Sequence, residues 1–231
     1  MPNKIDGSFL LLSEGSADKK FLEALTAHWL PEFSFAFPFP NDKFYAVSAF
    51  HKMLSAVRVD EVWQENGRGI ILIVDSCDSP QRTFNAVISE LRLAEGYGMP
   101  AREGEIAFSG TGEPPVAVLT IPEGNAGGLE SLYYDEMANR LPSLAANVST
   151  FLASTPSDVS NWNAEKQAKA RFAALVATSH RDDPSRAASA AYRRPPTIHI
   201  GSNIFRPLAE RVRGLCLAML EHAAAPPPNS V

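Results

Sequence analysis

Gly69-Ile-Ile-Leu-Ile-Val-Asp-Ser-Cys-Asp78 is the stretch of sequence that decides the fold. An apolar run from Ile70 to Val74 leads directly into Asp75, and a second carboxylate follows at Asp78. An unbroken run of this length, rich in isoleucine and valine, is typical of a strand that is buried on both faces in a parallel sheet. Ligands of open α/β sheets bind at the carboxyl ends of the strands, so the stretch predicts a site beside Asp75.

Strands and helices alternate on both sides of this stretch. Further strands are predicted at 8–13, 33–37 and 116–121, and 106–108 is a candidate for a short edge strand. Apolar residues at helical spacing predict the intervening helices, including one long helix from about 44 to 63. The alternation predicts an α/β fold with a mostly parallel, four-stranded central sheet that is flanked by helices.

The C-terminal third of the chain is predicted to be helical. We expect a single domain over residues 1–222, with its core at about 8–155 and a helical part at about 160–222, followed by a disordered tail at 223–231. The last amphipathic helix carries an apolar stripe from Phe205 to Met219. Such a stripe either packs inside the same chain or forms the contact of a homodimer.

Composition is that of an ordinary globular protein, with 231 residues, 45% hydrophobic residues and a net charge of -5. This charge argues against a broad electrostatic grip on nucleic acid, although a metal site or a local basic face can supply the contact. Cys77 and Cys216 give no disulfide framework and fit a reducing compartment. With no signal-peptide pattern and no apolar run of membrane-spanning length, we expect a cytoplasmic protein without a membrane partner.

Four carboxylates are predicted to meet at one edge of the sheet. Glu14 follows the strand at 8–13, Asp75 and Asp78 follow the central strand, and Glu130 follows the loop after the strand at 116–121. The carboxyl ends of parallel strands share an edge, so these side chains should converge. Clustered carboxylates repel one another unless a cation neutralises them, and the usual cation for an oxygen-only cluster is Mg²⁺ or Mn²⁺.

The motifs that supply these acids resemble a known family. Leu10-Leu-Leu-Ser-Glu14-Gly15 and Ile73-Val-Asp75-Ser-Cys-Asp78 are similar to the two signatures of the TOPRIM domain, the catalytic module of topoisomerases, primases and OLD-type nucleases. The chain most resembles small stand-alone bacterial TOPRIM-like proteins, several of which are linked to phage defence. They share a Pro-x-x-x-Gly-x-Leu-Glu stretch, loosely matched by 122–130, and a lysine-led helix that 165–172 resembles. The resemblance covers roughly residues 8–222.

This resemblance implies a TOPRIM-like fold and a Mg²⁺-dependent nuclease or related hydrolase that acts on DNA or RNA, as a phage-defence effector. Glu14 would be the general acid/base or a metal ligand, Asp75 a direct metal ligand, and Glu130 the residue that completes the metal shell. Lys166 would lie near the scissile phosphate and stabilise the negative charge that develops there.

One departure from the family pattern favours an alternative. The second signature is Asp-x-Asp, but Cys77 stands two residues after Asp75 and the carboxylate comes later, at Asp78. Thiolate is a poor ligand for Mg²⁺. The alternative is therefore a catalytically degenerate TOPRIM-like module that binds a partner protein or nucleic acid. A receiver-like phospho-acceptor domain ranks lower, because it needs an acidic pair after the first strand and only Glu14 follows here.

Structural roles compete with these functional ones. Asp78 can cap the helix that begins at Pro80, Glu130 can be an ordinary first-turn charge, and Ser16 or Asp18 can cap the helix after Gly15. The basic residues are candidates for nucleic-acid contact or for a solvated surface: Lys169, Arg193 and Arg194. The chain has no ATPase motif, so any nucleotide control would come from a partner ATPase or another defence protein.

Overall fold

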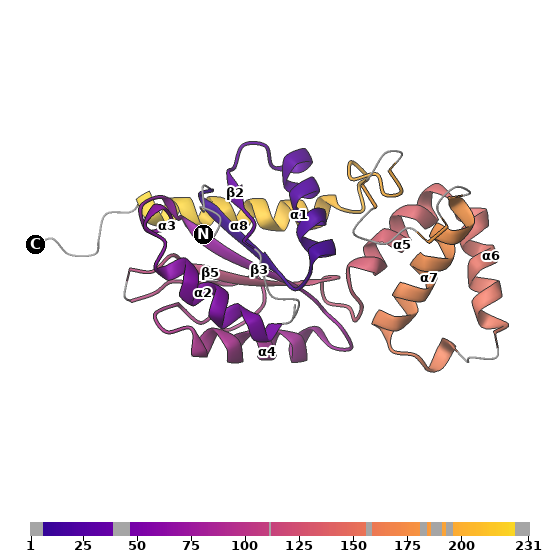
Figure 1. Cartoon of the computed structure of the whole chain (residues 1–231), viewed down its shortest axis with the longest axis horizontal. Helices are drawn as coiled ribbons and strands as arrows, with labels where there is room; N and C mark the ends of the chain where they lie inside the picture. Colours follow the sequence, from indigo (N-terminus) through magenta and orange to yellow (C-terminus); the bar gives the residue numbers. More distant parts are fainter. Residues whose placement is uncertain are drawn as a thin grey trace, which may run out of the picture.

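A five-stranded, mostly parallel sheet forms the centre of the protein, in the order β2-β1-β3-β5-β4 (Figure 1). The computed structural model describes residues 7–38, 47–110, 112–155, 159–180, 184–185, 191–192 and 196–224. The strands are β1 (Phe9–Ser13), β2 (Phe35–Ala36), β3 (Gly69–Asp75), β4 (Ile106–Ala107) and β5 (Val116–Ile121). The predicted α/β class and mostly parallel sheet are confirmed.

The predicted number of strands, four, was wrong by one edge strand. β4 pairs antiparallel with β5, with Ile106 opposite Ala117 and Ala107 opposite Val116. Two paired residues are too few to produce a periodic pattern, so the segment showed only as a candidate edge strand. β4 is the antiparallel member of an otherwise parallel sheet.

The unbroken apolar run in β3 follows from its central position. β3 lies between β1 and β5 and is parallel to both. Ile71 and Ile73 face one hydrophobic core, whereas Ile70, Leu72 and Val74 face the other. All five side chains are at most 2% exposed. A strand that is buried on both faces has no position for a polar residue until it leaves the sheet, which β3 does at Asp75.

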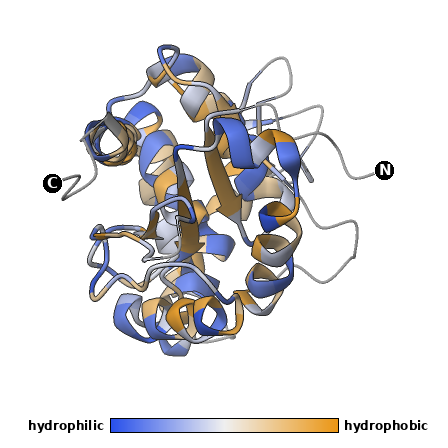
Figure 2. Ribbon diagram, turned by 90° about the vertical axis from the view of Figure 1, so that its left-hand side faces the viewer, coloured by the Kyte–Doolittle hydropathy of each residue, from blue (hydrophilic) through white to orange (hydrophobic). Residues whose placement is uncertain are grey.

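Helices cover both faces of the sheet and enclose its apolar strands (Figure 2). α1 and α8 supply side chains to the core on one face, and α2, α3 and α4 supply them on the other. The helices are α1 (Ser16–Trp29), α2 (Phe50–Arg58), α3 (Glu61–Asn66), α4 (Pro80–Leu93), α5 (Leu129–Arg140), α6 (Pro142–Ala153), α7 (Ala164–Ser179) and α8 (Arg206–Ala224), with 3-10 turns η1 (Val47–Ala49) and η2 (Val159–Asn161).

The single helix predicted from about 44 to 63 was wrong. η1, α2 and α3 occupy this region in succession, and residues 44–46 lie outside the described residues. The break comes at Asp60, whose carboxylate accepts a hydrogen bond from the backbone N–H of Trp63 at 2.9 Å and so caps α3. The apolar spacing continues across the break because both helices pack on the same core.

α5, α6 and α7 pack together beyond one end of the sheet and form a helical lobe, whereas α8 returns along the sheet (Figure 1). The apolar stripe from Phe205 to Met219, which begins just before α8 and continues along it, is buried in the core that α1 shares, so it packs inside the chain. α8 ends at Ala224, and the rest of the predicted tail lies outside the described residues. In the described part of the chain, no helix is both long and apolar enough to cross a bilayer.

Candidate acidic site at the carboxyl edge of the sheet

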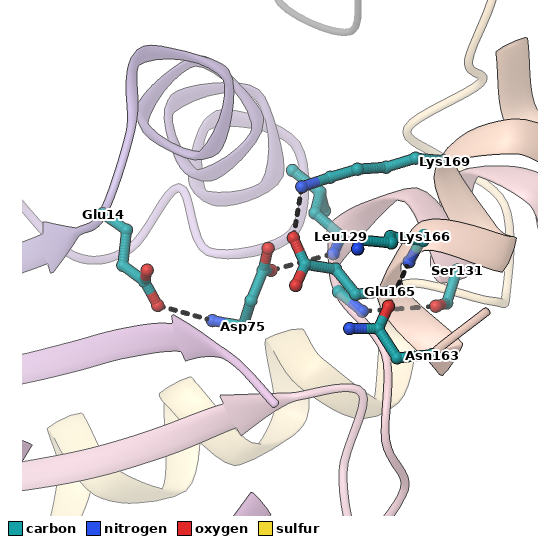
Figure 3. Close-up of polar contacts among 9 residues, drawn as sticks. Glu14, Asp75, Leu129, Ser131, Asn163, Glu165, Lys166 and Lys169 are labelled. Atoms are coloured by element: carbon teal, nitrogen blue, oxygen red, sulfur yellow. Dashed lines mark hydrogen bonds and ion pairs between the residues drawn. The ribbon is translucent and has the colours of Figure 1, made fainter. Parts of the chain in front are cut away.

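The acids that follow β1 and β3 meet at the carboxyl edge of the sheet. The two strands are parallel neighbours, with Ser13 opposite Ile73, so they leave the sheet side by side. Glu14 Oε1 accepts a hydrogen bond from the backbone N–H of Asp75 at 3.0 Å (Figure 3). The first carboxyl therefore lies directly against the residue that carries the second.

Helix α5 holds the Asp75 carboxyl in place. Asp75 Oδ1 accepts a hydrogen bond from the backbone N–H of Leu129 at 2.9 Å, at the helix N-terminus, where negative charge is favoured. The loop before α5 is bound to the end of β3: Ser76 Oγ donates to the Pro122 carbonyl at 2.8 Å, and the Gly127 N–H donates to the Cys77 carbonyl at 2.7 Å. These bonds place the first turn of α5, which carries Glu130, at the same edge.

The close approach of Asp75 to α5 requires glycine at position 128. A Cβ on Gly128 would lie 2.7 Å from Asp75 Oδ2 and 2.9 Å from its Cγ. We predict that Gly128→Ala pushes the carboxyl away from the Leu129 N–H and lowers the free energy of unfolding by about 1–2 kcal/mol. Denaturant unfolding measures this. The matched control is Gly110→Ala, where a Cβ meets nothing within 4 Å; an equal loss in both variants would contradict the prediction.

Asp18 is a member of the cluster that sequence reasoning missed. It lies in the first turn of α1, and its carboxyl accepts a hydrogen bond from the backbone of Gly15. A Cβ on Gly15 would lie 3.1 Å from Asp18 Oδ2, so this glycine leaves room for the carboxyl. Burial is the largest cause of the raised pKa of Asp75, and the charge of Asp18 is the second largest. Its position one turn after Glu14-Gly15 was the available signal, but it was interpreted only as a helix cap.

Burial raises the pKa of all three carboxyls in this cluster. The pKa of Asp75 rises to about 8 because of burial, reinforced by the charges of Asp18, Glu14 and Glu130. The pKa of Glu14 rises to about 7 because of burial, against which its hydrogen bond with the Asp75 backbone acts. The pKa of Asp18 rises to about 6 through burial and the charge of Glu130. At neutral pH the cluster therefore either retains protons or needs positive charge nearby.

Helix α7 brings a lysine and a further carboxyl to the cluster. Lys169 Nζ forms an ion pair with Glu165 one turn earlier (Figure 3). Burial opposes the charge of Lys169, but the hydrogen bond with Glu165 and the charges of Glu130, Glu165 and Asp75 raise its pKa overall. Lys169 in turn lowers the pKa of Glu14. Of the two lysines considered from the sequence, Lys169 is the one whose charge reaches these acids.

Lys166 is exposed on the first turn of α7. Its backbone N–H donates to Asn163 Oδ1 at 2.9 Å, which caps the helix. Its ammonium is in no ion pair of the described residues. Arg193 and Arg194, the other predicted nucleic-acid contacts, lie outside the described residues.

Asp78 and Cys77 lie in the turn that follows β3. Asp78 is exposed, and it does not cap α4, because Ser79 Oγ accepts the N–H of Arg82 at 3.3 Å instead. Cys77 has a positive φ of 49°. Burial, followed by the charges of Glu165, Glu14 and Asp75, raises the pKa of the Cys77 thiol to about 11, so the thiol is neutral beside the acids.

The oxygen donors at this edge are of the type that a hard divalent cation prefers, but their side chains are not arranged around a common point. Carboxylate oxygens from β1, β3 and α5 are the donors that Mg²⁺ and Mn²⁺ prefer. Within the described ranges, however, no three His, Cys, Asp or Glu side chains are arranged so that they could hold a metal ion together. Binding would require some of these short side chains to turn toward one another.

The fold and the site define an α/β protein with a partly buried acidic cluster at the carboxyl edge of a mostly parallel sheet. No protein-family model, curated protein or solved structure matches the chain. The functional assignment therefore depends on the chemistry of the cluster itself.

Proposed function

We propose that the protein is a TOPRIM-type, Mg²⁺- or Mn²⁺-dependent nuclease that acts on DNA or RNA in the cytoplasm, as an effector of phage defence. The observation that carries the proposal is the meeting of Glu14, Asp18 and Asp75 in a partly buried cluster where two parallel strands end. Burying carboxyls together destabilises a protein, and a divalent cation that binds them offsets this cost. Strongly shifted pKa values that result from burial and neighbouring charges cluster at functional sites, which supports the proposal.

The residues divide into ligands and proton carriers. Glu14, Asp75 and Glu130 would hold the cation, which, when bound, stabilises the negative charge that develops on a phosphodiester. If Glu14 stays outside the metal shell, it is suited instead to moving a proton, because its pKa of about 7 in the metal-free protein lies near the working pH. Lys169 takes the role that the family resemblance suggested for Lys166, because its charge already reaches the acids.

Cleavage assays test the proposal directly. Supercoiled plasmid and single-stranded RNA are incubated with the protein and Mg²⁺ or Mn²⁺, and we expect metal-dependent nicking or shortening. Glu14→Ala should reduce the rate about 100-fold or more, and Asp75→Ala should do the same or worse. Glu23→Gln, on the exposed side of α1, is the control and should cleave like the wild type. Inactivity of the wild type with both metals and both substrates would contradict the proposal.

A second candidate is a catalytically degenerate module that binds a partner protein or nucleic acid, such as a partner ATPase or another defence protein. The neutral thiol of Cys77, at the position of the second aspartate of the signature, favours it. This candidate would be selected if a partner co-purified equally well with the wild type, Glu14→Ala and Asp75→Ala, and if none of the three proteins cleaved nucleic acid. Loss of the partner in the acid variants would count against it.

A further inference from the structure

The helical lobe contains a cleft of about 420 Å³ between α6 and α7. A volume of this size is typical of small-molecule sites, which measure about 300–1,000 Å³ and combine apolar walls with a few polar groups. The apolar wall here is formed by Leu152, Ala153 and Val159, and the polar groups belong to Ser149, Gln167 and Arg171. The cleft therefore has the size and the mixed lining of a ligand site.

This cleft is separate from the acidic cluster at the sheet edge. Gln167 and Arg171 lie two residues after Glu165 and Lys169 of α7, respectively. Residues two apart in a helix point to different sides, so α7 presents one pair to the cluster and the other to the cleft. A ligand of the cleft would therefore bind independently of the metal-dependent function proposed above.

Arg171 is the one charged residue among the described residues that line the cleft. The sequence between Arg140 and Asp158 has no charged residue, so the α6 wall offers no counter-ion. The charge of Arg171 acts on Asp135 of α5, but no ion pair joins Arg171 to an acid within the described part of the chain. The guanidinium is therefore a cation whose charge the surrounding protein leaves largely uncompensated.

Neutral neighbours fix the position of this guanidinium. Arg171 Cζ lies 5.9 Å from the centre of the Tyr134 ring, and one Nη donates to Gln167 Oε1 at 3.4 Å. The Tyr134 hydroxyl lies 3.2 Å from Ser149 Oγ, which ties the ring to the α6 wall. A guanidinium has five N–H donors in one plane, and stacking on a ring leaves its in-plane donors available to an anion.

We propose that the cleft binds a small organic anion, whose carboxylate or phosphate pairs with Arg171 and whose apolar body lies against the wall formed by α6 and η2. An arginine matches both kinds of oxyanion with two parallel N–H···O bonds, which are stronger than bonds between neutral groups. The apolar body gains the free energy of leaving water, a contribution that an inorganic anion lacks. The ligand class is therefore an amphipathic anion with a ring or a branched chain.

Calorimetric titration of the full chain with four compounds tests the ligand class. Phenyl phosphate and benzoate carry a ring and an anion, benzyl alcohol carries the ring alone, and inorganic phosphate carries the anion alone. We expect phenyl phosphate, benzoate or both to bind, and the tighter of the two identifies the preferred anion. Benzyl alcohol and inorganic phosphate should bind about tenfold more weakly or not at all.

Three variants test the residues of the site. Arg171→Met should weaken binding about tenfold or more, because the anion loses its charged partner. Ala153→Phe should cause a similar loss with the arginine in place, since the larger side chain fills the cleft. Arg92→Met is the control: it removes an exposed arginine from α4, which packs on the sheet, and should leave the affinity unchanged. Melting curves check the fold of each variant.

The proposal fails if neither organic anion binds the wild type at about 10 mM, a concentration that reveals even millimolar affinities. It also fails if Arg171→Met or Ala153→Phe binds like the wild type, or if Arg92→Met loses as much affinity as Arg171→Met. Benzyl alcohol or inorganic phosphate binding as tightly as the organic anions would contradict the ligand class. None of these measurements depends on cleavage activity, so the two proposals can fail separately.

Discussion

In the absence of divalent cations, the protein is expected to become less stable as the pH rises from about 4 to about 8, by on the order of 4 kcal/mol in the free energy of unfolding. This is roughly a third of the full conversion of the three pKa shifts, because solvent screens carboxyls that are only partly buried. The cause is the cluster of Asp75, Glu14 and Asp18. Burial and mutual repulsion raise the pKa of these groups to about 8, 7 and 6, respectively, so the folded protein holds their protons more tightly than the unfolded chain does. A protein whose acids behave in this way is unusual, because acids paired with cations have lowered pKa values and stabilise the fold as the pH rises.

The direction of this pH effect follows from the protonation states of the three carboxyls in the folded and the unfolded protein. Below pH 4 these carboxyls are protonated in both states, and their contribution to stability is fully present. Between pH 4 and 8 the unfolded chain releases protons that the folded protein retains, so the free energy of unfolding falls. Above pH 8 the groups are ionised in both states and the contribution is lost. For a chain of this length, the loss corresponds to a decrease of roughly 10 °C in the melting temperature.

Thermal melts in EDTA at several pH values measure the effect. The control is the triple variant Glu14→Gln/Asp18→Asn/Asp75→Asn, which removes the three groups and leaves all other titrations in place. The free energy of unfolding of the wild type, minus that of the triple variant, should fall as the pH rises from about 4 to about 8. Mg²⁺ at pH 8 should restore stability to the wild type only, since a ligand that binds the folded state stabilises it. Equal pH profiles for the two proteins would contradict the prediction.

The sheet and the meeting of Glu14 with Asp75 were predictable for a physical reason. A strand buried on both faces must be apolar throughout, so β3 was evident in the sequence, and the parallel order of neighbouring strands then places their ends together. β4 was only a candidate because two residues show no periodicity. The helix predicted at 44–63 is broken because one side chain, Asp60, caps a new helix without changing the apolar spacing.

The rest of the site depends on tertiary packing, which local sequence does not specify. Asp18 occupies a first-turn position where aspartate is common for reasons of helix capping alone, so only its burial reveals a role in the cluster. The choice between Lys166 and Lys169 depends on the rotation of α7 about its axis. Phe172, buried against Tyr133, sets this rotation, which the positions of the two lysines along the sequence do not reveal.

Asp75→Asn is expected to make the metal-free protein more stable and at the same time to abolish metal binding and cleavage. Asparagine keeps the shape of the side chain, and its Oδ1 can still accept the Leu129 N–H, but it carries no charge among Asp18, Glu14 and Glu130. At pH 8 we expect an increase of about 2–3 kcal/mol in the free energy of unfolding, or roughly 6 °C in the melting temperature. The increase should disappear near pH 4, where the wild-type carboxyl is protonated.

Melting curves with and without Mg²⁺ compare Asp75→Asn with Asp78→Asn. The neighbouring aspartate is exposed, so its substitution should leave the stability of the metal-free protein unchanged. The wild type should gain stability from Mg²⁺, whereas Asp75→Asn should not, because a ligand of the cation is missing. A residue that served only the structure would behave in the opposite way, since loss of its charge at the N-terminus of α5 would destabilise the protein at every pH where the carboxyl is ionised. Gain of stability with loss of function is the result that distinguishes a carboxyl kept for binding from one kept for folding.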